Sequence, residues 1–234
     1  MIGNAPVRAI LLDVGGPMVD EREDNVHTVR VVCGILTEHL GREVREDEIE
    51  KARDAAIASW APSFTKAVLW EFLKPDRERT LAAYDEALSR IFSYREELRL
   101  MDGVAELVPK LATRYTLALA ANQPAVVKEK LERTGLMTYF KSSALSDDLG
   151  LSKPDTRFFL AICDRIGVPP EECCMIGDRL DNDIYPANIL GMRTIWVRIG
   201  PHAVQRPRIP EDVPDAEVEH MSEVLAVLDR WEKK

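Results

Sequence analysis

Polar side chains follow three apolar runs of the sequence, at the point where each run ends. Asp13 comes after I-L-L, Asn122 after A-L-A-A and Asp178 after M-I-G, and Lys153 lies in a further polar segment. Carboxylates, an amide and an ammonium are the groups that bind a divalent cation and an anionic substrate. These four residues are the first candidates for chemistry.

The segment that begins at Asp178 is unusually acidic. Asp178, Asp181 and Asp183 crowd the short run G-D-R-L-D-N-D, where their mutual repulsion needs a compensating cation. Hard oxygen ligands in small number predict magnesium that retains several waters. The alternative is that Asp181 and Asp183 only cap the helix that follows, a position that Asp favours.

The elements expected to position these residues alternate along the chain. Buried-strand runs alternate with segments whose apolar residues recur at helical spacing, which predicts a parallel sheet covered by helices on both faces. In such sheets ligands bind at the carboxyl ends of the strands. The strands are expected at residues 8–12, 115–121, 142–145, 173–176 and 194–197.

Residues from about 18 to 98 follow a different pattern, because apolar residues recur at helical spacing throughout. The simplest assembly is an α/β protein. Its Rossmann-like core domain would comprise residues 1–17 and 99–234. An all-helical cap domain, residues 18–98, would be inserted after the first strand.

Composition narrows the class of partner. The 234 residues include 40 acidic and 31 basic side chains, and the net charge of -9 argues against nucleic acid or an anionic membrane as a partner. The chain has no apolar run of the roughly 18 residues that span a bilayer and no secretory signal pattern. The four cysteines lack metal-site spacing and are expected as buried free thiols. A cytoplasmic protein that binds a small molecule is expected, and its oligomeric state is not indicated.

Four short motifs, in order and spanning essentially the whole chain, resemble those of the haloacid dehalogenase-like (HAD) hydrolase superfamily. They are D-V-G-G-P-M-V-D from Asp13, L-A-L-A-A-N ending at Asn122, S-K-P-D from Ser152 and I-G-D-R-L-D-N-D-I from Ile176. The insertion directly after the first motif resembles the helical cap of the phosphoglycolate phosphatase-like branch.

The resemblance implies phosphoryl transfer from a small phosphorylated substrate onto a carboxylate, followed by hydrolysis of the aspartyl-phosphate. Asp13 would be the nucleophile. Lys153 would neutralise charge shared between Asp13 and the phosphoryl oxygens. The matched motif positions also imply that Gly16 and Asn122 bind the substrate.

A magnesium ion is also implied, because a carboxylate that attacks a phosphate dianion meets strong repulsion. Asp13, Asp178 and the carbonyl oxygen of Gly15 would hold the ion. Asp183, as a further catalytic residue, would orient a water of the ion's shell.

Three positions depart from the family's phosphatase pattern. Gly15 stands where a second aspartate protonates the leaving oxygen and activates water, Pro17 replaces a threonine, and Ala121 replaces a serine or threonine. General acid-base catalysis contributes roughly 10² to 10⁴ in rate, so alkyl phosphates, which have poor leaving groups, would be affected most.

These departures leave three hypotheses open. In the first, the protein is a magnesium-dependent phosphatase with altered chemistry, and the missing acid comes from the segment after the first motif. Candidates for that acid are Asp20, Glu21, Asp24 and His27. In the second, the protein is a non-catalytic descendant that keeps the fold, with or without the metal site, to bind a ligand or partner.

The third hypothesis is a dehalogenase- or phosphonatase-like hydrolase, because these branches also lack the second aspartate. Phosphonatases form a Schiff base on a cap lysine, for which Lys66 and Lys74 are candidates. The dehalogenase branch works without metal, so the acidic segment from Asp178 argues against it.

Overall fold

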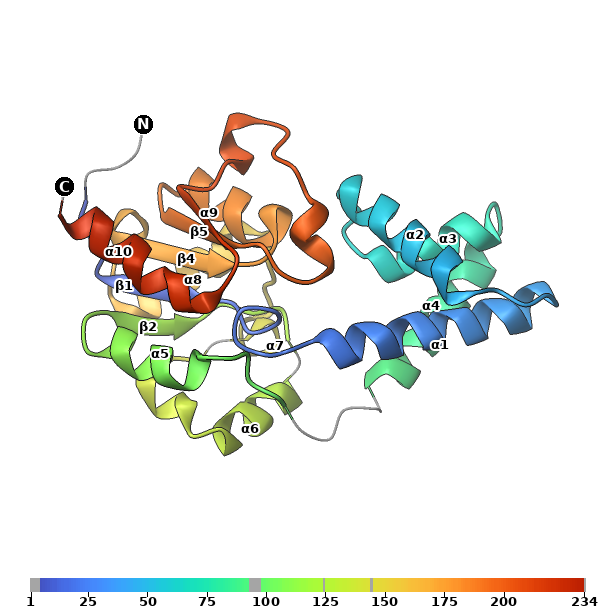
Figure 1. Cartoon of the computed structure of the whole chain (residues 1–234), viewed down its shortest axis with the longest axis horizontal. Helices are drawn as coiled ribbons and strands as arrows, with labels where there is room; N and C mark the ends of the chain where they lie inside the picture. The colour runs from blue at the N-terminus through green and yellow to red at the C-terminus, as the bar shows by residue number, and fades with distance from the viewer. Residues whose placement is uncertain (1–4, 93–97, 124, 144, 234) are drawn as a thin grey trace. The chain divides into compact units, whose positions relative to one another are not determined.

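Figure 1 shows the computed structural model of the chain, which describes residues 5–92, 98–123, 125–143 and 145–233. The chain divides into two compact units. The sheet unit contains Met1–Asp20 and Leu98–Lys234, and the helical unit contains Glu21–Glu97. The helical unit begins at Glu21, whereas the sequence predicts a start at residue 18. The boundary lies later because Met18 and Val19 are buried in the core of the sheet unit.

The described residues of the sheet unit form a six-stranded, entirely parallel sheet in the order β3-β2-β1-β4-β5-β6. The predicted α/β, Rossmann-like fold is therefore confirmed, and the order is that of doubly wound nucleotide-binding sheets. The strands are β1 (Ala9–Leu12), β2 (Thr116–Leu119), β3 (Phe140–Ser142), β4 (Cys173–Gly177), β5 (Arg193–Val197) and β6 (Ala216–Val218).

Successive residues of each strand face opposite sides of the sheet, where they meet different helices. On β1, Ile10 and Leu12 pack with α5, α6 and α10, whereas Ala9 and Leu11 pack with α8 and α9. Strands buried on both faces read as continuous apolar runs, which is the pattern seen in the sequence. The helices of this unit are α5 (Val104–Ala112), α6 (Ala125–Arg133), α7 (Ser146–Leu149), α8 (Thr156–Ile166), α9 (Tyr185–Ile189) and α10 (Val224–Glu232).

Two edge elements differ from the sequence expectation. The third strand, expected at 142–145, is Phe140–Ser142, and Leu145 makes only an isolated bridge with Ala121. The short sixth strand, Ala216–Val218, was not predicted. Its three residues include a glutamate, and such a short mixed run carries no periodic signal.

The helical unit contains α1 (Arg22–Leu40), α2 (Glu46–Ala58), α3 (Phe64–Leu73) and α4 (Arg77–Phe92). Its own core includes Ile35 and Leu36 of α1 and Leu69 of α3, all fully buried. Helix α1 ends at Gly41, which adopts the left-handed conformation typical of helix C-termini.

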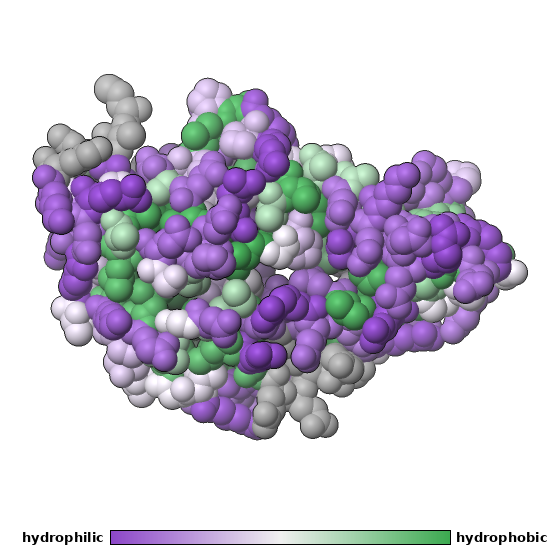
Figure 2. Space-filling view, viewed as in Figure 1, coloured by the Kyte–Doolittle hydropathy of each residue, from purple (hydrophilic) through white to green (hydrophobic). Residues whose placement is uncertain are grey.

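Hydrophilic side chains cover most of the visible face of both units, with small apolar patches between them (Figure 2). Among the described helices, none has the length and apolar character needed to cross a membrane. All four cysteines are free, and Cys163, Cys173 and Cys174 are buried, as expected for these three.

Truncation of the central strand tests the buried core. Leu11→Ala, at a fully buried site of β1, is expected to lower the free energy of unfolding by about 2–5 kcal/mol. Leu160→Ala is the matched control on α8, because Leu160 is 39% exposed, and should lower it by less than about 1 kcal/mol. Urea titration measures both values, and equal losses would contradict the packing described.

Candidate active site

The two aspartates at the ends of β1 and β4 emerge side by side. Leu12 pairs with Ile176 in the parallel ladder, and the backbone N–H of Asp13 donates to the carbonyl of Ile176 at 3.0 Å. Asp178 follows one residue after β4 ends. Here the chain crosses from one half of the sheet to the other, which is where doubly wound sheets bind ligands.

A buried cluster of charged side chains lies at these strand ends. Carboxylate oxygens of Asp13, Asp178 and Asp183 lie within 4.8 Å of one another. The ammonium of Lys153 is 2.9 Å from Oδ1 of Asp13 and 2.6 Å from Oδ1 of Asp183. All four residues are buried. The structure thus brings together the four charged residues that the motifs singled out.

Two glycines make room for these carboxylates. A Cβ at Gly177 would lie 2.3 Å from Cγ of Asp183, so a side chain there would displace the carboxylate. Gly16 has a φ of +83°, and a Cβ there would lie 3.0 Å from Cγ of Asp178. The backbone N–H of Gly16 donates to the carbonyl of Val19 at 3.1 Å. Gly16 therefore shapes the turn beside Asp178, and its role in substrate binding stays a prediction.

Asn122 holds the backbone of Lys153. Its Nδ2 donates to the carbonyl of Lys153 and its Oδ1 accepts from the N–H of Lys153, both at 2.8 Å. The segment after β2 thereby places the lysine that contacts Asp13. A substrate-binding role for Asn122 stays a prediction and would use the second hydrogen of Nδ2.

The acidic segment after β4 divides into two sets of contacts. Asp178 and Asp183 join the cluster around Lys153, whereas Asp181 bonds to the guanidinium of Arg179 at 3.1 and 2.5 Å and to Nε2 of Gln205 at 2.9 Å. Grouping all three aspartates around one cation was therefore wrong for Asp181. The turn is π-helical over Leu180–Ile184, so its side chains depart from ordinary helical spacing.

Burial and charge together determine the protonation of the cluster. Burial raises the pKa of Asp183 to about 6, the Asp13 carboxylate adds to the rise, and Lys153 opposes it. Burial by itself would lower the pKa of Lys153, but Asp13 and Asp183 outweigh it and raise that pKa. Lys153 is therefore an ammonium ion in the folded protein.

The donor set fits a hard divalent cation. Three carboxylates and one ammonium give the cluster of Asp13, Asp178, Asp183 and Lys153 a formal charge of -2. Buried charge of one sign is unfavourable unless a counter-ion balances it, and carboxylate oxygens are the ligands that Mg²⁺ and Ca²⁺ prefer. The site can thus hold a cation with Asp13 and Asp178.

The candidates for the missing acid fall in both units. Asp20 belongs to the sheet unit with Asp13 and is buried, whereas Glu21, Asp24 and His27 belong to the helical unit. Asp20 Oδ2 is 4.0 Å from Nε of Arg99. Asp20 is thus the one of the four that shares a unit with Asp13.

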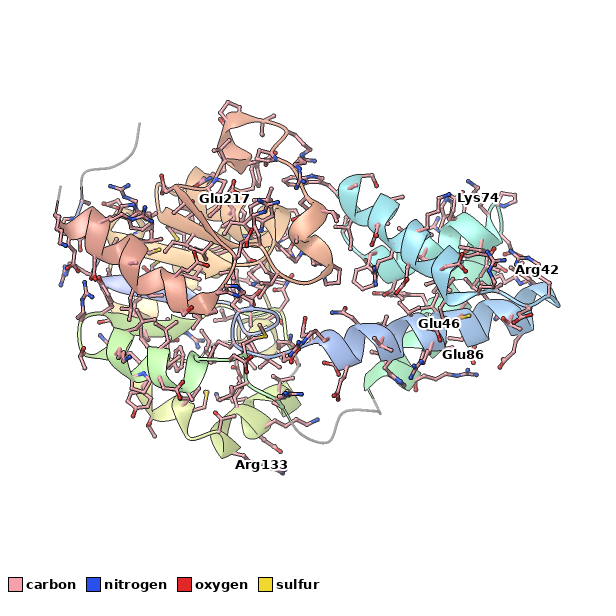
Figure 3. The ribbon with its side chains drawn as sticks, in the orientation of Figure 1. Arg42, Glu46, Lys74, Glu86, Arg133 and Glu217 are labelled. Carbon is pink, nitrogen blue, oxygen red and sulfur yellow. The ribbon has the colours of Figure 1, made fainter. Side chains whose placement is uncertain are left out.

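The two Schiff-base candidates are surface lysines. Lys74 lies on the helical unit (Figure 3), and its Nζ is 2.9 Å from a carboxylate oxygen of Glu71. Lys66 is exposed, and its Nζ lies 4.6 Å from the centre of the Tyr84 ring. A Schiff-base lysine is activated in a desolvated pocket or beside another cation, so the exposure of both amines argues against the phosphonatase hypothesis.

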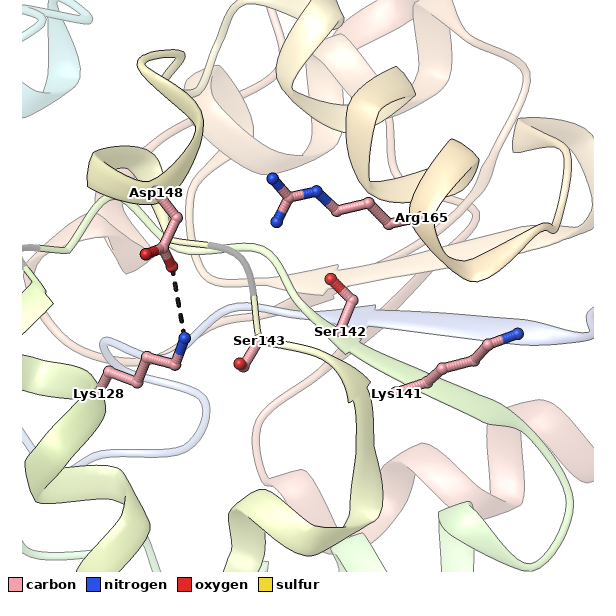
Figure 4. A pocket seen from close by; sticks show the side chains of 6 residues that line it. All are labelled: Lys128, Lys141, Ser142, Ser143, Asp148 and Arg165. Carbon is pink, nitrogen blue, oxygen red and sulfur yellow. Dashed lines mark ion pairs between the residues drawn. The ribbon is translucent and has the colours of Figure 1, made fainter.

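Apart from the charged cluster, a recess of about 430 Å³ lies beside the edge strand β3 (Figure 4). Two of its three cations have protein partners, because Lys141 donates to the carbonyl of Ile166 at 2.7 Å and Lys128 lies 3.8 Å from Asp148. Charged side chains beside an edge strand also prevent pairing with other chains. Lys141 and Lys128 are thus engaged by groups of the protein itself.

Gly177→Ala tests the geometry of the charged cluster. The new Cβ would displace Asp183 from Lys153 and leave a buried ion without its partner, so we expect a loss of about 3–5 kcal/mol of folding stability. The control is Gly34→Ala, at a helical site with no atom within 4 Å of the new Cβ, which should gain about 0.5–1 kcal/mol. If chemical denaturation shows that Gly177→Ala is as stable as the unmodified protein, the assigned position of Asp183 is refuted.

Comparison with known proteins places this geometry in a family. A family model for haloacid dehalogenase-like hydrolases matches residues 7–191. Glyceraldehyde 3-phosphate phosphatase of Methanopyrus kandleri is 28% identical over 236 aligned positions, which cover 95% of this chain and 97% of that protein. Phosphoserine phosphatase of Thermus thermophilus is 36% identical over 180 positions, covering 73% and 67%.

A solved structure agrees with this assignment. The HAD phosphatase from Thermococcus onnurineus superposes with a TM-score of 0.62 at 26% identity, over 95% of this chain and 98% of that one. The similarity extends over both units of the chain. The family match over residues 7–191, together with the charged cluster at the ends of β1 and β4, shows that the chain belongs to the haloacid dehalogenase-like hydrolase family.

Proposed function

We propose that the protein is a magnesium-dependent phosphatase that acts on a small organophosphate through an aspartyl-phosphate on Asp13. The observation that carries the proposal is the contact of Lys153 with both Asp13 and Asp183, beside Asp178. The names of the two relatives support it, because each is described as a phosphatase of a small phosphorylated metabolite. The free thiols are consistent with the reducing cytoplasm.

Asp13 is oriented before a substrate arrives. Its Oδ1 accepts hydrogen bonds from the N–H of Val14 at 2.8 Å and from Nζ of Lys153 at 2.9 Å. A fixed carboxylate attacks phosphorus in line and forms the aspartyl-phosphate as the leaving oxygen departs. Lys153, held by Asn122, stabilises negative charge that develops on the phosphoryl oxygens.

The residues that would hold magnesium are Asp13, Asp178 and the carbonyl of Gly15, and Asp183 would orient a water molecule. Bound there, the ion supplies positive charge that offsets repulsion between the nucleophile and the phosphate dianion. Asp183 is fixed for its role, because its Oδ2 accepts from the N–H of Arg179 at 3.0 Å.

The acid that protonates the leaving group is not at residue 15, so we propose altered acid-base chemistry. Asp20 is the candidate in the sheet unit, and the helical unit is proposed as the cap that supplies the other three candidates. Without an acid in place, substrates with good leaving groups, such as aryl and acyl phosphates, react faster than alkyl phosphates.

The charged cluster argues against a non-catalytic descendant. Replacing a buried ion pair by apolar side chains of similar volume is often neutral or stabilising, so stability alone gives no reason to keep Asp13, Asp183 and Lys153 together. A descendant that only binds a cation here would need the acidic ligands but no ammonium among them. An enzymatic role explains the whole cluster, because the nucleophile, its ammonium partner and the acidic ligands are all needed for chemistry.

Intact-protein mass spectrometry tests the nucleophile. After incubation with magnesium and acetyl phosphate, we expect a covalent adduct of one phosphoryl group, because the absence of a carboxylate at residue 15 slows the attack of water. The matched control, Asp13→Asn, should carry no adduct. The absence of an adduct, together with no turnover of para-nitrophenyl phosphate, would favour the non-catalytic hypothesis.

Restoring the missing acid tests the proposed chemistry. Gly15→Asp is expected to increase the turnover of phosphoserine, an alkyl phosphate, by about 10² or more. Turnover of para-nitrophenyl phosphate should rise much less, since its leaving group needs little protonation. Steady-state kinetics on the two substrates gives the ratio, and equal changes would contradict an acid-base defect at residue 15.

A further inference from the structure

A glutamine from outside the four motifs is buried against the acidic turn. Gln205 is 1% exposed and follows the helical turn Pro201–Val204, in the segment after β5. Its Nε2 donates to Oδ1 of Asp181 at 2.9 Å, and its Oε1 accepts from the N–H of Leu180 at 2.8 Å. The amide thus bonds both to the backbone and to a side chain of the segment between Asp178 and Asp183, two of the three carboxylates of the charged cluster.

These bonds continue to the charged cluster. The guanidinium of Arg179 bonds to Asp181, and the backbone N–H of Arg179 donates to Oδ2 of Asp183 at 3.0 Å. At the start of the turn, Nε1 of Trp196 donates to the carbonyl of Asp178 at 2.8 Å. The turn is therefore tied at its start by β5 and at its centre by Gln205.

We infer that Gln205, acting through Asp181 and Arg179, is a positioning residue that sets the affinity of the site for its divalent cation. The inference rests on the proposed function, since it assigns a task to a residue that touches neither the cation nor the substrate. Asp13, Asp178 and Asp183 repel one another in the absence of a cation. Because the turn is bonded to a neighbouring segment, Asp178 and Asp183 stay in place against this repulsion. The entropy cost of ordering these carboxylates when the cation binds is then smaller, and the affinity for the cation is higher.

A purely structural role for Gln205 makes a different prediction. If the amide only fills its buried position, its loss lowers stability with and without cation by the same amount. The concentration of Mg²⁺ that gives half of the maximal stabilisation then stays unchanged. This concentration, read from thermal unfolding of the full chain across a Mg²⁺ titration, separates the two roles without any assay of activity.

Four variants test the inference. Gln205→Leu removes both bonds, and Gln205→Glu keeps the acceptor for Leu180 but sets a carboxylate against Asp181. For both we expect the half-saturating Mg²⁺ concentration to rise about tenfold or more. Asp181→Asn is a third variant that weakens the same contacts from the other side. The double variant Gln205→Glu/Asp181→Asn restores a donor–acceptor pair between the two side chains and should need less Mg²⁺ than Gln205→Glu. It should not reach the affinity of the unmodified protein, because the amide of residue 181 loses one of the two acceptors that bond to Arg179.

Two controls make the outcomes distinguishable. Val227→Ala, at a buried site of α10, should lower the melting temperature and leave the half-saturating Mg²⁺ concentration unchanged. Asp178→Asn should abolish the Mg²⁺ effect. Suppose that Mg²⁺ stabilises the unmodified protein, and that the folded Gln205 and Asp181 variants have the same half-saturating Mg²⁺ concentration as the unmodified protein. The inference is then overturned and the proposed function stands. If Mg²⁺ does not stabilise the unmodified protein, the metal site and the inference both fail.

Discussion

Three carboxylates within 4.8 Å of one another repel, and the ammonium of Lys153 holds two of them, those of Asp13 and Asp183, at 2.9 and 2.6 Å. Burial strengthens both effects, because a low dielectric increases repulsion and attraction alike. The position of Lys153 is consequently the constraint on which the site depends. Asn122 holds Lys153 in this position through two hydrogen bonds to its backbone. Gly177 has no side chain and so leaves room for Asp183 beside Lys153.

The parallel sheet supplies the other half of the arrangement. Adjacent parallel strands end at one edge, so Asp13 after β1 and Asp178 after β4 lie together although 164 positions separate β1 from β4 in the ladder (Ala9 opposite Cys173). No loop has to order itself to bring these two residues together. The turn after β4 is less constrained by the sheet, and it is held instead by side chains of β5 and of the segment that follows β5.

The site contains the ammonium and the carboxylates that balance charge, but it has no carboxylate at residue 15 to donate or accept a proton. In the proposed mechanism, Lys153 and the acidic ligands act on the phosphoryl group and its nucleophile, whereas a carboxylate at residue 15 would act on the leaving oxygen. These tasks are separable, because they concern different atoms of the substrate. Under the proposal, the absence of a carboxylate at residue 15 narrows the range of leaving groups and leaves in place the residues that form an aspartyl-phosphate. The altered first motif is then compatible with membership of a hydrolase family.

The sequence by itself determined the α/β class, most strands and the positions of Asp13 and Asp178, and the resemblance of its motifs to a known family added Lys153 and Asp183 to the site. Buried parallel strands leave continuous apolar runs, and a polar residue at the end of such a run lies at the ligand-binding edge whatever the details of packing. The tertiary structure decided the partners of side chains in the turns. Asp181 resembles its neighbours in the sequence, and only the approach of Gln205 from beyond β5 shows that it belongs to a different set of contacts. Contacts between segments far apart along the chain leave no periodic signal, and for that reason the role of Gln205 was visible only in three dimensions.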